Sequence, residues 1–80
     1  MTRDEIEEKL RQGIASITSR DKSSLAVEIP LHEMGIDSLS FVEILVFIEK
    51  TFNLRLIELD LTKKDLETIR ALASFIAAKL

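Results

Sequence analysis

The residues of this sequence best suited to chemistry are the neighbouring Asp37 and Ser38, which precede a long apolar run that begins at Leu39. A serine hydroxyl acts as a nucleophile when a nearby base accepts its proton. The single histidine, His32, lies six residues upstream in a segment that the sequence predicts as a loop. We expect His32 to be a surface residue and expect no catalytic residue in this chain. Any chemistry at Ser38 would then be done by another protein.

Two interpretations of the Asp37–Ser38 pair stay open at this point. In the first, Asp37 is the N-cap of a helix and Ser38 only occupies its first turn, where polar side chains satisfy unpaired N–H groups. In the second, the same geometry exposes the hydroxyl rigidly at a helix N-terminus, which favours an attached phosphate. The second interpretation makes Ser38 a residue that another enzyme modifies.

Composition narrows the class of protein. The 80 residues predict one domain over 1–80 with a single small core. The absence of cysteine excludes a disulfide framework and a thiolate metal site, and the single histidine, expected in a surface loop, argues against a zinc site and a Ser–His–Asp triad. The acidic start "MTRDEIEEK" is no secretory signal, and the longest apolar run, Ile44–Ile48, is far short of the roughly 20 residues that span a membrane. We expect a cytoplasmic protein with no metal site and no membrane span.

Charge is distributed unevenly along the chain. The net charge of −3 argues against nucleic-acid binding through a basic surface. The interval between Lys22 and Lys50 contains no lysine or arginine, and Ser38 lies within it. This interval is either a solvated surface that happens to be acidic or a field that steers basic partners towards Ser38. Its acidic residues are Glu28, Glu33, Asp37, Glu43 and Glu49.

The first third of the chain predicts a helix followed by a long loop. Apolar residues at helical spacing and acidic residues in the first turns place the helix at about 3–18. The segment 19–36 contains Pro30 and Gly35, which break regular structure. We expect this loop to be ordered, because apolar side chains would hold it on the core. The helical stripe is Ile6, Leu10, Ile14 and Ile17, and the loop anchors are Leu25, Val27, Ile29, Leu31 and Met34.

A second helix is predicted over 39–52, with so broad an apolar arc that more than one side must be contacted. Val42 and Val46 form a second apolar flank on the side of Ser38. Phe47 falls on the polar side, either packed under the long loop or exposed for a partner. The core stripe is predicted to contain Phe41, Leu45, Ile48 and Phe52, with Ile44 beside it.

The last third predicts two more helices. Thr62 is a suitable N-cap for a one-turn helix over 63–66, and Thr68 for a final helix. The predicted fold is therefore all-α: a small four-helix bundle of three main helices and one short helix, with a long ordered loop between helices 1 and 2. The final helix has the apolar positions Ile69, Leu72, Ala73, Ile76 and Leu80.

The segment "LHEMGIDSLSFVEILVFIEKTF" resembles the attachment segment of the acyl carrier protein and peptidyl carrier protein family. The later "DLTKKDLETIRALASFI" is similar to the family's short third helix and its fourth helix, so the resemblance covers essentially the whole chain. The residues that match the family's motif are Leu31, Met34, Gly35, Ile36, Asp37, Ser38, Leu39, Val42 and Glu43.

The resemblance implies that Ser38 is the attachment site for 4′-phosphopantetheine, which a separate phosphopantetheinyl transferase transfers from coenzyme A using Mg²⁺. The thiol of that arm would carry an acyl or aminoacyl group as a thioester. Asp37 would support the attachment by helping to position the transferase's metal and substrate. The chain itself would be a carrier and not an enzyme.

The resemblance also implies a partner-binding surface on the second helix. Leu39, Val42 and Val46 would form an apolar contact patch, and Glu43 and Glu49 would meet basic patches on acyl-loading and acyl-processing enzymes. Rim charges of this kind set the encounter rate more than the affinity, which suits a carrier that must dissociate. We expect a monomer.

The second helix is less uniformly acidic than in the family's fatty-acid-synthesis members. Ser40 stands where an acid is common, and Lys50 interrupts the acidic run. These changes favour a freestanding acyl carrier of a specialised lipid or secondary-metabolite pathway over the housekeeping carrier of fatty acid biosynthesis. An aminoacyl or peptidyl carrier is the alternative within the family. A non-carrier helical interaction domain, such as a helix-turn-helix DNA binder, is the alternative from another class.

Overall fold

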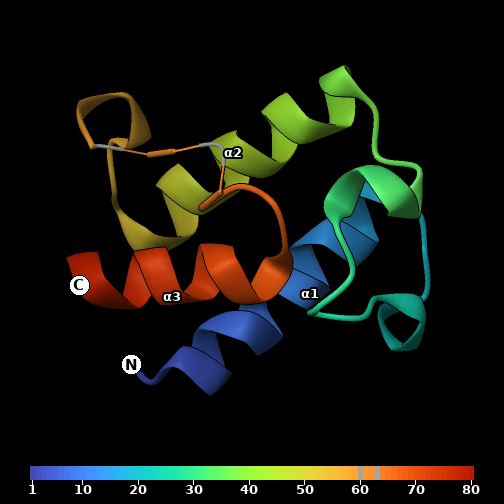
Figure 1. Ribbon diagram of the computed structural model, residues 1–80, viewed down its shortest axis with the longest axis horizontal. Coiled ribbons are helices and arrows are strands. Elements are labelled where there is room, and N and C mark those ends of the chain that lie inside the picture. The colour runs from blue at the N-terminus through green and yellow to red at the C-terminus, as the bar shows by residue number, and fades with distance from the viewer. Residues whose placement is uncertain (60, 63) are drawn as a thin grey trace.

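The computed structural model describes residues 1–59, 61–62 and 64–80, and that part of the chain contains helices and turns and no strand. The predicted all-α class is therefore confirmed. The connection between the first two helices lies at the end of the molecule opposite the two termini (Figure 1). The elements are the α-helices α1 (Arg3–Thr18), α2 (Ser38–Phe52) and α3 (Ile69–Lys79), and the short 3-10 helices η1 (Lys22–Ser24), η2 (Leu31–Met34) and η3 (Leu56–Glu58).

The N-termini of all three α-helices follow from local side-chain chemistry. Thr2 and Glu5 bond reciprocally in a capping box at the start of α1, so the helix begins where the sequence predicts. Asp37 caps α2 and Thr68 caps α3, as expected. The caps leave few unpaired N–H groups at the helix ends, which stabilises short helices.

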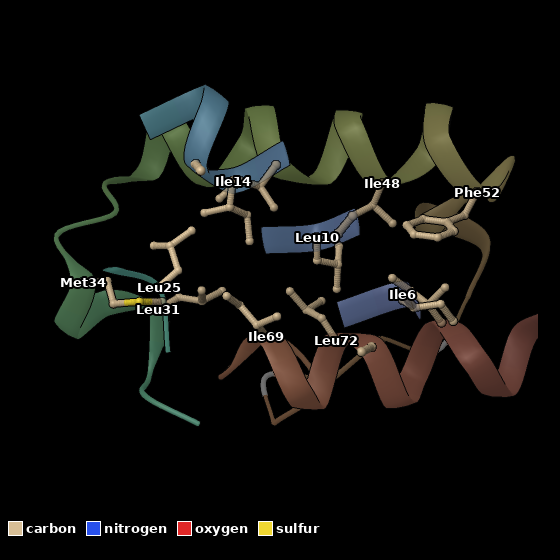
Figure 2. Close-up of a cluster of buried hydrophobic side chains, with 14 of the residues drawn as sticks. Ile6, Leu10, Ile14, Leu25, Leu31, Met34, Ile48, Phe52, Ile69 and Leu72 are labelled. Carbon is tan, nitrogen blue, oxygen red and sulfur yellow. The ribbon is translucent and has the colours of Figure 1, made fainter. Parts of the chain in front are cut away.

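The core lies where α1 faces both α2 and α3. In Figure 2, Ile6, Leu10 and Ile14 of α1 point between Ile48 of α2 and Leu72 of α3. All five side chains are completely or almost completely buried. The core is thus built from the apolar stripes that the sequence predicts for the first and last helices, apart from Ile17, which is only partly buried, and Leu80. Leu80 is exposed because α3 ends at Lys79, beyond the packed turns.

The inward stripe of α2 differs from the predicted one. Ile44, Ile48 and Phe52 are buried, whereas Phe41 and Leu45 are only partly buried at the margin of the core. One residue along a helix is a rotation of about 100°, so turning Ile44 inward moves Leu45 towards the side. The sequence prediction placed the correct residues on the helix but centred the core stripe on the wrong ones.

The long connection between α1 and α2 is ordered by backbone hydrogen bonds as well as by apolar side chains. The N–H of Leu31 donates to the carbonyl of Glu67 over 2.9 Å, and the N–H of Arg70 donates to the carbonyl of Val27 over 3.0 Å. These bonds attach the connection to the start of α3. Leu25, Leu31 and Met34 are buried and Val27 is partly buried, as predicted.

Ile29 is the loop anchor that the sequence prediction placed wrongly, because 45% of its surface is exposed. The prediction took every one of these apolar side chains as an anchor on the core. A turn closes between Ala26 and Ile29, where the Ile29 N–H donates to the Ala26 carbonyl over 3.4 Å. Ile29 lies at the end of this turn and is exposed to solvent.

The predicted short helix over 63–66 is not seen in the residues that the structure describes. Lys63 lies outside them, and residues 64–66 form turns. Thr62 nevertheless caps this segment, since its Oγ1 accepts from the Asp65 N–H over 3.3 Å while the Asp65 carboxylate accepts from the Thr62 N–H over 3.0 Å.

Phe47 follows neither of its two predicted environments. It is partly buried and packs against α1 at Gly13, where a Cβ would lie 2.3 Å from the Phe47 ring. Only a residue without a side chain lets the ring approach so closely. The ring of Phe47 on α2 therefore packs directly against Gly13 on α1. This contact could not be predicted from the sequence of either helix alone.

Candidate functional site

The chain reaches the N-terminus of α2 through a turn that needs glycine. Gly35 ends η2 in the left-handed region with a φ of 74°, which costs residues other than glycine free energy. A Cβ at this position would also lie 2.9 Å from Nη2 of Arg20. The turn directs Ile36 and Asp37 out of the loop and sets the direction in which α2 begins.

Asp37 is the N-cap of α2. Its carboxylate accepts a hydrogen bond of 2.8 Å from the N–H of Ser40, and this bond is the main reason that the pKa of Asp37 is lowered from its usual value. The side chain is thus ionised and committed to the helix end at neutral pH. The capping role predicted for Asp37 is confirmed.

Ser38 is the first residue of α2 and is exposed. Because Asp37 satisfies the helix end, the Ser38 hydroxyl is not needed as a cap. The position next to a helix N-terminus favours a negatively charged substituent on that hydroxyl. His32 is exposed on η2, as the sequence predicts, and no cluster of three or more possible metal ligands occurs among the described residues.

A hollow of about 620 Å³ opens beside Ser38. Its walls come from three separate parts of the chain: η2, the first turn of α2 and the turn that precedes α3. Most of the lining is apolar, but charged side chains lie among it. The lining residues are Leu31, His32, Ile36, Asp37, Ser38, Phe41, Lys64, Leu66 and Glu67.

The outer face of α2 carries the predicted apolar patch. Leu39, Val42 and Val46 expose 71%, 55% and 42% of their surface, and Glu43 is exposed among them. Their spacing places these four residues on one stripe that begins directly after Ser38. The structure therefore brings four of the five predicted partner-binding residues together on one open face.

Glu49 has a different environment from Glu43. It is half-buried, and its carboxylate accepts a hydrogen bond of 3.0 Å from the N–H of Leu56. Glu49 thereby ties the end of α2 to η3. This bond could not be predicted from the sequence, because η3 was not predicted.

Sequence reasoning also missed the far wall of the hollow. Lys64, Leu66 and Glu67 follow Ser38 by more than 25 residues, and no spacing rule connects the two segments. The loop bond between Leu31 and Glu67 brings them together. Only the long-range fold reveals that Lys64 and Ser38 border the same space.

Comparison with known protein families gives a match over residues 8–76 to the family described as phosphopantetheine attachment site. The match covers most of the 80 residues and includes the Asp37–Ser38 segment. The chain belongs to this family. Searches of curated proteins and of solved structures found no match.

Membership of the phosphopantetheine attachment family identifies the protein as a carrier. Such domains are not catalysts: a phosphopantetheinyl transferase modifies them with covalent 4′-phosphopantetheine, and enzymes of a pathway then act on what the arm holds. None of the helices that the structure describes is long and apolar enough to cross a bilayer. The family also argues against a plain helical interaction domain or a DNA binder.

Proposed function

We propose that Ser38 carries the 4′-phosphopantetheine arm and that the protein is an acyl carrier of a specialised lipid or secondary-metabolite pathway. The observation that carries the proposal is the exposed Ser38 hydroxyl at the first position of a helix that Asp37 already caps. The residues fit the group, because a phosphate on this hydroxyl would lie at the positive end of α2 and beside open space.

The arm would be attached by a substitution at phosphorus. The Ser38 oxygen would form a bond to the phosphorus next to the pantetheine of coenzyme A, the phosphoanhydride bond would break with release of adenosine 3′,5′-bisphosphate, and the hydroxyl proton would go to the transferase's base or to solvent. The thiol of the bound arm supplies the thioester chemistry. The contribution of this chain is to hold the hydroxyl rigidly and in the open, and Asp37 offers an ionised carboxylate beside the transferase's metal.

The exposed stripe of Leu39, Val42, Glu43 and Val46 is the surface that we propose partner enzymes contact. An apolar patch next to the attachment residue can be buried by a partner, while Glu43 attracts basic residues at the rim. Glu49 is assigned a smaller share of partner binding, because its carboxylate already accepts from Leu56.

An acyl cargo is favoured over an aminoacyl cargo by the walls of the hollow. Leu31, Ile36, Phe41 and Leu66 offer an apolar surface at the base of the arm. Such a surface would stabilise an aliphatic chain more than the charged amine of an amino acid. An aminoacyl or peptidyl carrier is the second candidate within the same family, and loading assays with candidate adenylating enzymes would separate the two.

The test of Ser38 is incubation with a promiscuous phosphopantetheinyl transferase, Mg²⁺ and coenzyme A, followed by intact-mass measurement. The protein should gain the mass of one phosphopantetheine, and Ser38→Ala should gain nothing. Ser23→Ala is the matched control, since Ser23 is exposed on η1 and should leave the gain unchanged. A gain that survives Ser38→Ala would refute the assignment.

A further inference from the structure

The charged side chains around the hollow are unequally free to interact with a new group. Asp37 and Glu67 are the acidic residues of the lining, and His32 and Lys64 are the basic ones. The carboxylate of Asp37 is committed to the Ser40 N–H. Lys64 is exposed and forms no ion pair with any residue that the structure describes.

A phosphodiester on Ser38 would be repelled by a neighbouring negative charge, and a cation that lines the hollow could reduce this repulsion. It places a negative charge next to Asp37, whose own carboxylate is ionised. Like charges this close repel each other, and the N-terminus of α2 offsets only part of the repulsion. A cation on another wall of the same space would offset more of it, because an ammonium ion bonds strongly to phosphate oxygens.

Lys64 is better suited to this task than His32. An imidazole loses its charge near neutral pH, whereas a lysine ammonium keeps it. The flexible four-carbon stem of lysine also lets its charge move towards a group across an open space. The first atoms of the arm are bonded to Ser38 itself, so their position is fixed more closely than that of the cargo.

We propose that Lys64 pairs with the phosphodiester on Ser38 and is a positioning residue that directs the start of the arm across the hollow towards the turn before α3. This inference rests on the proposed attachment at Ser38. It makes the direction of the arm depend on one charge that lies far from Ser38 in the sequence. Raising the salt concentration should weaken the pair and release the arm.

The experiment uses ³¹P NMR on the arm-bearing protein, after intact mass has shown that each variant carries the arm. In the unaltered protein the phosphodiester resonance should move as NaCl is raised. In Lys64→Gln it should start at the high-salt position and stay there, and Lys64→Arg should restore the salt response. Lys50→Gln is the matched control, because Lys50 is an exposed lysine that does not line the hollow, and it should behave as the unaltered protein.

A Lys64→Gln spectrum with the resonance position and salt response of the unaltered protein would overturn the proposal. Circular dichroism shows whether each variant is folded, and Lys64 is exposed, so all variants should fold. Failure of the unaltered protein to gain the arm is a separate result, seen by mass before any spectrum is recorded. That result would refute the attachment at Ser38 together with the role of Lys64.

Discussion

The N-termini of α2 and α3 solve the same structural problem with different atoms. At α3, the hydroxyl of Thr68 accepts from the N–H of Ala71 over 3.0 Å, so the hydroxyl is the cap. At α2, the carboxylate of Asp37 accepts from the N–H of Ser40, and the hydroxyl of Ser38 follows it uncommitted. Because a carboxylate provides the cap, α2 can expose the hydroxyl of Ser38 without weakening the helix end.

The residues after the two caps differ as well. Ile69 follows Thr68 and is completely buried, whereas Ser38 follows Asp37 and is exposed. The start of α3 is therefore part of the core, and the start of α2 is part of the surface. If Ser38 carries the arm as we propose, the start of α2 serves as an attachment site because its first side chain is exposed and the preceding residue provides the cap.

The first prediction, with the largest change, tests whether an exposed serine at the first position of a helix is enough for transfer of the arm. Arg3 follows the cap Thr2 in α1 and is exposed, so the double variant Arg3→Ser, Ser38→Ala moves the serine to a similar position. We expect a complete loss of arm transfer, because α1 lacks the hollow and the apolar stripe beside Ser38. Intact mass after incubation with the transferase and coenzyme A measures it.

An arm found on residue 3 of the double variant would contradict this expectation. It would show that a capped helix and an exposed hydroxyl are enough for the transferase. The single variant Arg3→Ser is the control and should gain one arm, at Ser38.

The next prediction compares how much the hydroxyls of Thr68 and Ser38 contribute to the stability of the protein. Thr68→Ala should lower the free energy of unfolding by about 1 kcal/mol, the usual cost of a lost hydroxyl cap. Ser38→Ala should change it by no more than about 0.5 kcal/mol, because the hydroxyl does not cap α2. Urea unfolding followed by circular dichroism measures both. Equal losses would show that the Ser38 hydroxyl also supports its helix.

A third comparison separates the capping role of Asp37 from its charge. Asp37→Ala removes both, while Asp37→Asn keeps an oxygen that can accept from Ser40. We expect Asp37→Ala to lower both the urea midpoint and the rate of arm transfer. Asp37→Asn should recover most of the midpoint but not the rate, if the carboxylate contacts the transferase's metal as we propose. Equal transfer rates for Asp37→Asn and the unaltered protein would exclude the proposed supporting role.

The smallest effect is the pH dependence of stability. The Ser40 N–H lowers the folded-state pKa of Asp37, and bonds from Thr2 lower that of Glu5 in α1. Each group therefore stabilises the fold above its unfolded pKa of about 4, and this contribution disappears as the pH falls through the lower folded pKa. Urea midpoints between pH 6 and pH 2 should fall less steeply for Asp37→Asn than for the unaltered protein. Identical slopes would contradict the shift at Asp37.

The parts of the fold that the sequence predicts correctly depend on neighbouring residues. The bounds of α1 and the caps Asp37 and Thr68 depend on residues within a few helical turns, so the pattern in the sequence contains these interactions. Helical spacing also predicted the second apolar flank of α2 at Val42 and Val46, whereas the contact surface that includes Leu39 and Glu43 was implied by the resemblance to carrier proteins. A capping bond and a helical stripe are local, and local chemistry can be deduced from a single sequence.

The parts that were wrong or missed depend on residues far apart in the chain. Phe47 lies against Gly13 of another helix, and Lys64 reaches the hollow because the loop bonds to Glu67. Ile29 was predicted as an anchor because it is apolar, but it lies in a turn and is exposed. Such contacts are set by how the helices pack, and packing is not encoded in the spacing of any one segment.

We propose that the hydroxyl of Ser38, which Asp37 frees from capping the helix, carries the arm. The most direct measurement is fragmentation mass spectrometry on proteolytic peptides of the protein isolated from its native host. We predict that the mass of phosphopantetheine, with any acyl cargo, is located on Ser38 and on no other residue. An arm located on another residue, or a Ser38 that is unmodified in the native protein and stays so with transferase and coenzyme A, would contradict the account.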